Sequence, residues 1–274
     1  MTRRSGVKAL ATALPLALAA LALPAKAECS RDIAVPVAPI GASITSGGGT
    51  VGGIYPEALR APSASAGCNL MFSVVPRARL EVLFDIGKAD LLLPASRTPA
   101  RDLIGTFVPM IGHRATLLSV ASNRPPLTSA QDLLDRHELR VAVVRGYDYG
   151  EQYQALVREL AKQGRLFQEV DTVAIARLMQ SGSIDVTIMG PTTFAGAVTR
   201  EPRVAGLMDK LRIEPIPELP WSYSGAYVSR RSLKPEDQAA LLALIEQVAR
   251  SSTVMEGFQR YHRADILAGS VRPR

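Results

Sequence analysis

A short pattern that occurs twice constrains the fold of this chain more than any other feature of its sequence. In each copy, a helical segment is followed by a glycine, two further residues, an aspartate and an apolar run of strand length, at Gly87–Asp90 and at Gly182–Asp185. Helical and strand-like segments alternate around both copies, which is typical of largely parallel sheets flanked by helices. The repeat therefore predicts an α/β protein with two similar lobes, each built on its own sheet.

The spacing of apolar residues and the positions of chain breakers predict the main elements. A glycine-rich loop at 41–53 lacks the phosphate-loop pattern, so we expect it to be a flexible connection. Helices are expected at 79–86, 128–137, 151–162, 172–180, 234–248 and 258–267, and strands at 31–37, 72–75, 89–93, 107–120, 139–144, 184–189 and 218–229.

Residues 1–27 are expected to form a secretory signal peptide. Basic residues precede an apolar segment at about 9–23, and Ala25–Ala27 fits a small-x-small cleavage site. The apolar segment is short for a membrane span. We therefore expect a soluble protein that is exported to the periplasm after cleavage near Ala27.

The charge of the mature chain argues against a nucleic-acid partner. The full chain has a formal net charge of +7, but the signal peptide holds four of the 32 basic residues and none of the 25 acidic residues. The mature chain is left with three more basic than acidic residues, and it contains no run of Lys and Arg. No motif for a cofactor occurs, so we expect neither nucleic acid nor a cofactor to bind.

Cys29 and Cys68 are the only two cysteines of the chain. In an exported protein their natural state is a disulfide. The alternative, a metal site on the two thiolates, lacks histidines at ligand spacing. We therefore expect a Cys29–Cys68 disulfide and no metal.

Two turns at strand ends carry the groups that best suit a ligand. The apolar run after Asp90 ends in a hydroxyl-rich turn that contains Ser96, Thr98 and Arg101. The strand at 139–144 ends in a second turn, which offers backbone N–H groups, a guanidinium and two aromatic rings. Turns of this kind, between a strand and the next helix, are where α/β lobes present donors to a ligand.

The layout, the Thr-Pro-Ala-Arg turn at Thr98–Arg101 and both Gly-x-x-Asp strands resemble the family 3 solute-binding proteins, the periplasmic amino-acid receptors of ABC transporters. The resemblance covers almost all of the mature chain. It implies the type II periplasmic binding protein fold, with lobe 1 at 28–117 plus 224–274, lobe 2 at 118–223, and two crossing strands between them. It also implies a monomer that binds a small molecule and delivers it to an ABC transporter permease.

The resemblance also implies a ligand site between the lobes. Arg101 would hold a carboxylate through two parallel N–H···O bonds, with donors added by Ser96 and Thr98. The turn at 145–149 would face it from lobe 2. The expected ligand-binding residues are Ser96, Thr98, Arg101, Arg145, Gly146, Tyr147, Asp148 and Gly190.

Two departures from the family pattern bear on the ligand. Gly190 stands where the family has a carboxylate that pairs with the ammonium group of an amino acid, and the first loop, Pro39–Ala42, lacks the usual aromatic residue. A small organic anion or a modified amino acid therefore suits the site better than a free α-amino acid, unless Asp148 supplies the missing charge.

Catalytic motifs are absent from the sequence. The three histidines form no H-E-x-x-H pattern, and no G-x-S-x-G elbow occurs. We therefore expect a binding protein and not an enzyme. Two alternatives stay open, namely a sensory module that reports to a membrane kinase, and a cyclohexadienyl-dehydratase-like enzyme on the same fold, for which Glu57 or Asp148 could be the acid.

Overall fold

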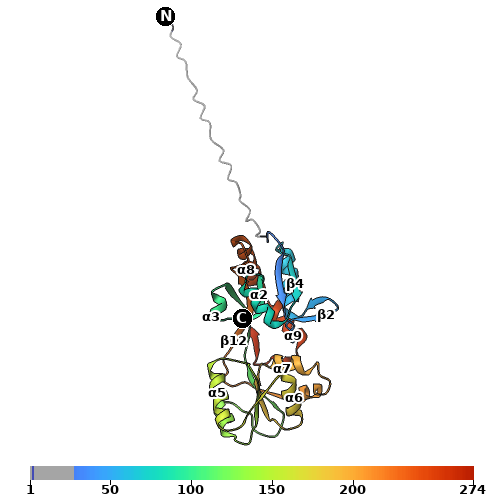
Figure 1. Cartoon of the computed structure of the whole chain (residues 1–274), viewed down its shortest axis with the longest axis vertical. Helices are drawn as coiled ribbons and strands as arrows, with labels where there is room; N and C mark the ends of the chain where they lie inside the picture. The colour runs from blue at the N-terminus through green and yellow to red at the C-terminus, as the bar shows by residue number, and fades with distance from the viewer. Residues whose placement is uncertain (1, 3–27) are drawn as a thin grey trace.

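The computed structural model describes Thr2 and residues 28–274, and it shows two lobes arranged along the long axis of the molecule (Figure 1). The expected signal peptide, residues 1–27, lies outside the described residues apart from Thr2. Within the described part of the chain, no helix combines the length and the apolar character needed to cross a membrane.

Lobe 1, which is the upper lobe in Figure 1, contains a four-stranded sheet in the order β13-β6-β12-β5 and a parallel pair, β1-β4. Helices α1 and α8 pack against each other over its core. The strands are β1 (Ile33–Val37), β4 (Leu70–Val74), β5 (Leu91–Ser96), β6 (Gly105–His113), β12 (Ser222–Ser229) and β13 (Val271–Pro273), with a small hairpin of β2 (Thr45–Gly47) and β3 (Thr50–Gly52). The helices are α1 (Ile54–Ser65), α2 (Arg77–Asp85), α3 (Pro99–Asp102), α8 (Pro235–Arg250) and α9 (Thr253–Tyr261).

Lobe 2 is built on a five-stranded sheet in the order β11-β7-β10-β8-β9. Strand β8 pairs in parallel with β10 and with β9. Strand β7, which follows the first connection between the lobes, pairs antiparallel with β10 and with β11. The strands are β7 (Thr116–Val120), β8 (Val141–Val144), β9 (Leu166–Glu169), β10 (Val186–Met189) and β11 (Leu211–Glu214). The helices are α4 (Ala130–Asp135), α5 (Glu151–Lys162), α6 (Thr172–Gln180), α7 (Pro191–Val198) and the 3-10 helix η1 (Ala205–Lys210).

The repeated Gly-x-x-Asp pattern makes the same contacts in both lobes. Asp90 donates its N–H to the carbonyl of Ala34 and accepts the N–H of Ala34 on its carboxylate, at 2.9 and 2.7 Å. Asp185 makes the same pair of bonds with Arg140, at 3.0 and 2.8 Å. Burial acts to raise the pKa of Asp90, but hydrogen bonds, foremost from Arg31, outweigh it and lower that pKa. Both aspartates therefore have a structural role, because each fastens the start of its strand to the neighbouring strand.

The chain passes between the lobes in two short segments. The strand signal expected over 107–120 covers two strands, because lobe 1 strand β6 ends at His113 and lobe 2 strand β7 begins at Thr116. The strand signal is continuous there, but the backbone changes sheets at 114–115. The chain returns at 215–221, between β11 and β12. The expected lobe limits, 117 and 223, fall close to these two segments.

The end of the chain forms a third connection. The single helix expected over 258–267 is wrong: α9 ends at Tyr261, and a separate helix, α10 (Ala264–Leu267), follows two extended residues. The break lets neighbouring side chains reach different lobes, since Ile266 is buried in the core of lobe 2 and Leu267 in the core of lobe 1. Strand β13 then pairs with β6 in lobe 1.

The replacement Ile266→Ala is expected to lower the free energy of unfolding by about 2–4 kcal/mol, because it removes a 2 % exposed side chain from a packed core and leaves a cavity. Urea denaturation followed by circular dichroism measures the change. Leu103→Ala is the matched control. Because Leu103 is 81 % exposed, this replacement should lower the free energy of unfolding only slightly. Equal losses in the two variants would mean that Ile266 does not anchor the C-terminal segment.

Candidate ligand site

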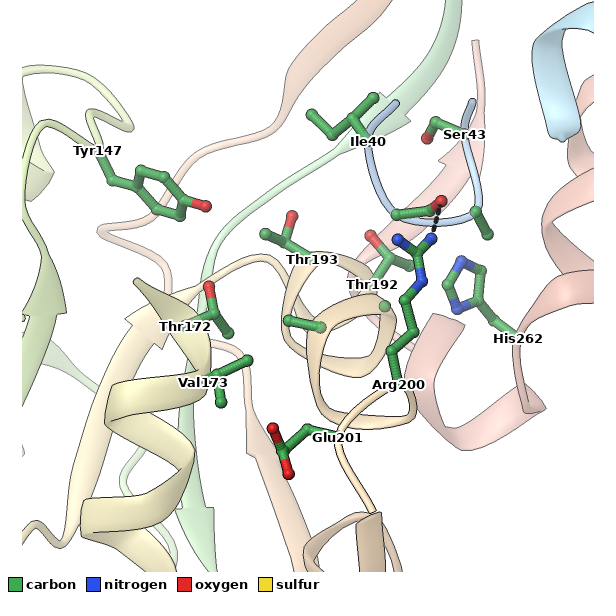
Figure 2. A pocket seen from close by; sticks show the side chains of 14 residues that line it. Ile40, Ser43, Tyr147, Thr172, Val173, Thr192, Thr193, Arg200, Glu201 and His262 are labelled. Carbon is green, nitrogen blue, oxygen red and sulfur yellow. Dashed lines mark hydrogen bonds between the residues drawn. The ribbon is translucent and has the colours of Figure 1, made fainter. Parts of the chain in front are cut away.

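A cavity of about 440 Å³ lies between the loop after β1 in lobe 1 and the helices α6 and α7 in lobe 2 (Figure 2). Its size is within the range of sites for small molecules. Loop 40–43 forms one wall, and the first turns of α6 and α7 form the other. Residues that are far apart in the sequence therefore meet around one space between the lobes.

The lobes touch at one edge of this cavity, and a glycine permits the contact. A Cβ atom on Gly196 in α7 would lie 3.1 Å from the Cα of Gly41, so any side chain at this position would push the loop away. Arg200, two residues beyond α7, donates a hydrogen bond to the carbonyl oxygen of Gly41 (Figure 2). Loop 40–43 is thus held against lobe 2 by a close backbone approach and by one guanidinium.

Side-chain hydroxyls are the most common polar groups of the cavity lining. They are carried by the loop after β1, by the turn after β8, and by the first residues of α6 and α7. Within the described part of the chain, none of these hydroxyls takes part in a hydrogen bond, so each is available to a ligand. They belong to Ser43, Tyr147, Thr172, Thr192 and Thr193.

Local sequence explains why the three threonines of the lining lie in the first turns of helices. Asp171 caps α6 by accepting the N–H of Ala174 at 2.7 Å, so Thr172 occupies the first turn. Pro191 takes the first position of α7, where its missing N–H is no loss. Thr192 and Thr193 follow it and line the cavity (Figure 2).

Besides Tyr147, the lining contains three titratable residues, Arg200, Glu201 and His262. Glu201 forms an ion pair with Arg177 at 3.1 Å, which compensates its charge. Burial lowers the pKa of His262 below its ordinary value, so the ring is neutral at neutral pH. The guanidinium of Arg200 is the one charge of the lining that has no ion-pair partner among the described residues.

The turn predicted in lobe 1 is occupied by bonds within the protein. Arg101 donates to the carbonyl of Ser96 and to the carboxylate of Glu81, both at 2.8 Å. Thr98 caps α3 by accepting the N–H of Arg101, and its own N–H donates to the hydroxyl of Tyr227 at 2.9 Å. Ser96, Thr98 and Arg101 do not line the cavity.

The turn predicted in lobe 2 contributes one residue, Tyr147, to the cavity. Arg145 donates its N–H to the carbonyl of Glu169, and Gly146 has the positive φ of 82° that the turn requires. Asp148 accepts the N–H of Gly150 at 2.9 Å and lies outside the lining.

The eighth predicted residue, Gly190, is the N-cap of α7 and donates its N–H to the hydroxyl of Tyr149 at 3.4 Å. It lies next to the cavity and not in its lining. Sequence reasoning missed most of the lining, although Asp171 before Thr172 and Pro191 before Thr192 were signals that a threonine would stand at a helix start.

Comparisons with known proteins agree on the fold. No family model and no curated protein matches the chain. The second substrate-binding domain of a putative amino acid ABC transporter from Streptococcus pneumoniae matches with a TM-score of 0.61 and 16% identity, over 88% of this chain and 99% of that domain. The ancestral amino-acid-binding protein AncCDT-1, a precursor of cyclohexadienyl dehydratase, matches with a TM-score of 0.57 and 16% identity, over 83% and 94%.

A histidine kinase sensor domain with similarity to periplasmic binding proteins matches with a TM-score of 0.55 and 19% identity, over 87% of this chain and 96% of that domain. At these identities the matches show the fold alone. The chain therefore has the predicted two-lobed periplasmic binding protein fold.

Proposed function

We propose that this chain is an exported solute-binding protein of the family 3 type, which captures a small carboxylate-bearing ligand between its lobes and delivers it to an ABC importer. The observation that carries the proposal is the cavity itself. It is lined from both lobes, it offers five free hydroxyls and a guanidinium, and its volume of about 440 Å³ suits a small molecule.

The charge of the site supports binding of an anion. A guanidinium presents several donors in one plane and binds a carboxylate through parallel bonds. Two arginines compete for this role. Arg101 is the candidate from sequence, and it is paired with Glu81; Arg200 is the candidate from the geometry of the cavity.

A second candidate function is that of a sensory module, which the similarity to a histidine kinase sensor domain favours. Both functions need the same ligand site, and they differ in the partner that reads the bound form. Catalysis has less support, because Glu201, the one carboxylate of the lining, is already paired with Arg177.

Thermal denaturation of the mature protein, residues 28–274, against a panel of amino acids, N-modified amino acids, and small mono- and dicarboxylates tests the proposal. A ligand present at about 100 times its Kd stabilises the native state by about 2.7 kcal/mol, which corresponds to a rise in Tm of roughly 5–10 °C for a protein of this size. The expected result is a rise with carboxylates. Absence of a rise with every compound would contradict the proposed capture of a carboxylate.

A further inference from the structure

The guanidinium of Arg200 has no ion-pair partner among the described residues, although it lines the cavity. Four other arginines discussed above form ion pairs: Arg31 with Asp90, Arg101 with Glu81, Arg140 with Asp185 and Arg177 with Glu201. Arg200 has instead a neutral partner, the carbonyl oxygen of Gly41. The carboxylate of the adjacent Glu201 points away from the guanidinium of Arg200 (Figure 2). It pairs with Arg177.

The remaining groups of the cavity show what else a ligand would meet. Apolar side chains lie on both walls of the cavity, Ile40 on loop 40–43 and Val173 and Ala197 on α6 and α7, and Ile40 is 44 % exposed. The free hydroxyls described above can donate to a carboxylate or bond a neutral polar group. An ammonium group, by contrast, would find no uncompensated carboxylate in the lining.

We infer that Arg200 is the anion-binding residue of this site, and that the ligand is a small monocarboxylate with a short alkyl part and no cationic group. The inference rests on the proposed function, which it deepens by naming the ligand class and the residue that selects it. One uncompensated guanidinium matches one carboxylate, and the apolar side chains on the two walls match the alkyl part. A zwitterionic amino acid would leave its ammonium group unpaired in the cavity, which lowers its affinity.

Arg200 also links ligand binding to the contact between the lobes. Its guanidinium reaches from the end of α7 to loop 40–43, so a carboxylate bound to it lies where both lobes meet. A guanidinium carries five donors, and one of its NH2 groups bonds Gly41. Donors therefore remain for a ligand while the contact with the loop persists.

Isothermal titration calorimetry with three compounds of one carbon skeleton tests the ligand class. The probes are 4-methylpentanoate, 2-hydroxy-4-methylpentanoate and leucine, which differ at C2 by hydrogen, hydroxyl and ammonium; inorganic phosphate is the control for a simple anion. We expect both carboxylates without an ammonium group to bind at least about tenfold more tightly than leucine and phosphate. Leucine or phosphate binding as tightly as the first two would overturn the ligand class.

Variants of Arg200 and Arg101 test which arginine binds the carboxylate. Because Arg200 is exposed, Arg200→Gln is expected to weaken binding of the two carboxylates by about tenfold, and Arg200→Lys by less, since it keeps the charge. Arg101→Gln is the matched control and should change their Kd little. Unchanged melting of the unliganded variants shows that each is folded. Loss of binding in Arg101→Gln but not in Arg200→Gln would overturn the assignment in favour of the sequence-based candidate.

The two experiments distinguish a wrong ligand class from a wrong proposed function. If no monocarboxylate without a cationic group binds while an amino acid or a dicarboxylate of the thermal panel does, the inferred ligand class is wrong and the proposed function stands. If no compound of either set binds, both fall.

Discussion

Replacement of Glu214 by alanine is expected to lower the free energy of unfolding by about 3–5 kcal/mol, because it breaks a buried ion pair and leaves the partner uncompensated. Glu214 on β11 is 3 % exposed. Its two carboxylate oxygens accept hydrogen bonds from the hydroxyl of Ser119 at 2.9 Å, from the guanidinium of Arg124 at 2.6 and 3.0 Å, and from the N–H of Leu127 at 2.8 Å.

The loss should be large because none of these donors has ready access to water. The side chain of Arg124 is 15 % exposed, and the bond from Leu127 is buried. Without Glu214 the start of the segment that leads to α4 would lose its attachment to the edge of the lobe 2 sheet. Glu214→Gln keeps the size and some of the bonds, so its loss should be smaller.

Urea denaturation followed by circular dichroism measures the effect. Glu159→Ala is the matched control, because the Glu159–Lys162 pair is exposed and should contribute at most about 0.5 kcal/mol. If Glu214→Ala unfolds at the same urea concentration as Glu159→Ala, the network around Glu214 does not stabilise lobe 2.

Much of the fold could be predicted from local sequence, because the residues at the ends of several helices and strands mark where these elements begin and end. Helices α5 and α6 begin and end at the residues expected from apolar spacing. Helix α6 has an aspartate cap, and both helices are followed within two residues by a glycine with positive φ, Gly164 or Gly182. The paired Gly-x-x-Asp motifs predicted two lobes for the same reason, since each motif contains the groups that hold its strand in place.

The missed elements depend on distant partners. Three short strands were missed, β9, β11 and β13. Each has only three or four residues and forms a strand because it pairs with a neighbouring strand. Helix α7 begins at Pro191, directly after its N-cap Gly190. The pair looks like a turn in sequence, but proline also suits the first position of a helix.

The site was harder to predict than the fold. Its lining comes from loop 40–43, the turn after β8, the starts of α6 and α7, and His262, and no spacing in the sequence brings these together. The Thr-Pro-Ala-Arg turn was visible in sequence, whereas the pairing of Arg101 with Glu81, 20 residues earlier, is a property of the folded lobe.

Removal of the disulfide is expected to have the second large effect, a loss of about 4 kcal/mol of stability on the chain-entropy model. The bond between Cys29 and Cys68, predicted from the exported setting, is present and closes a loop with a sequence separation of 39. It ties the segment before β1 to the end of α1, and Cys68, which is 1 % exposed, is part of the lobe 1 core. The double variant Cys29→Ser, Cys68→Ser should therefore unfold at a clearly lower urea concentration.

The disulfide also affects the cavity, because the segment that it closes contains part of the cavity wall. Loop 40–43, one wall of the cavity, lies inside the segment that the disulfide closes. Without the bond, that segment can open locally at a lower free-energy cost, so amide hydrogen exchange should rise at 40–53 more than in lobe 2. Addition of a reductant should reproduce both effects in the parent protein and change nothing in the double variant. Equal urea midpoints for the oxidised parent and the double variant would show that the bond does not stabilise lobe 1.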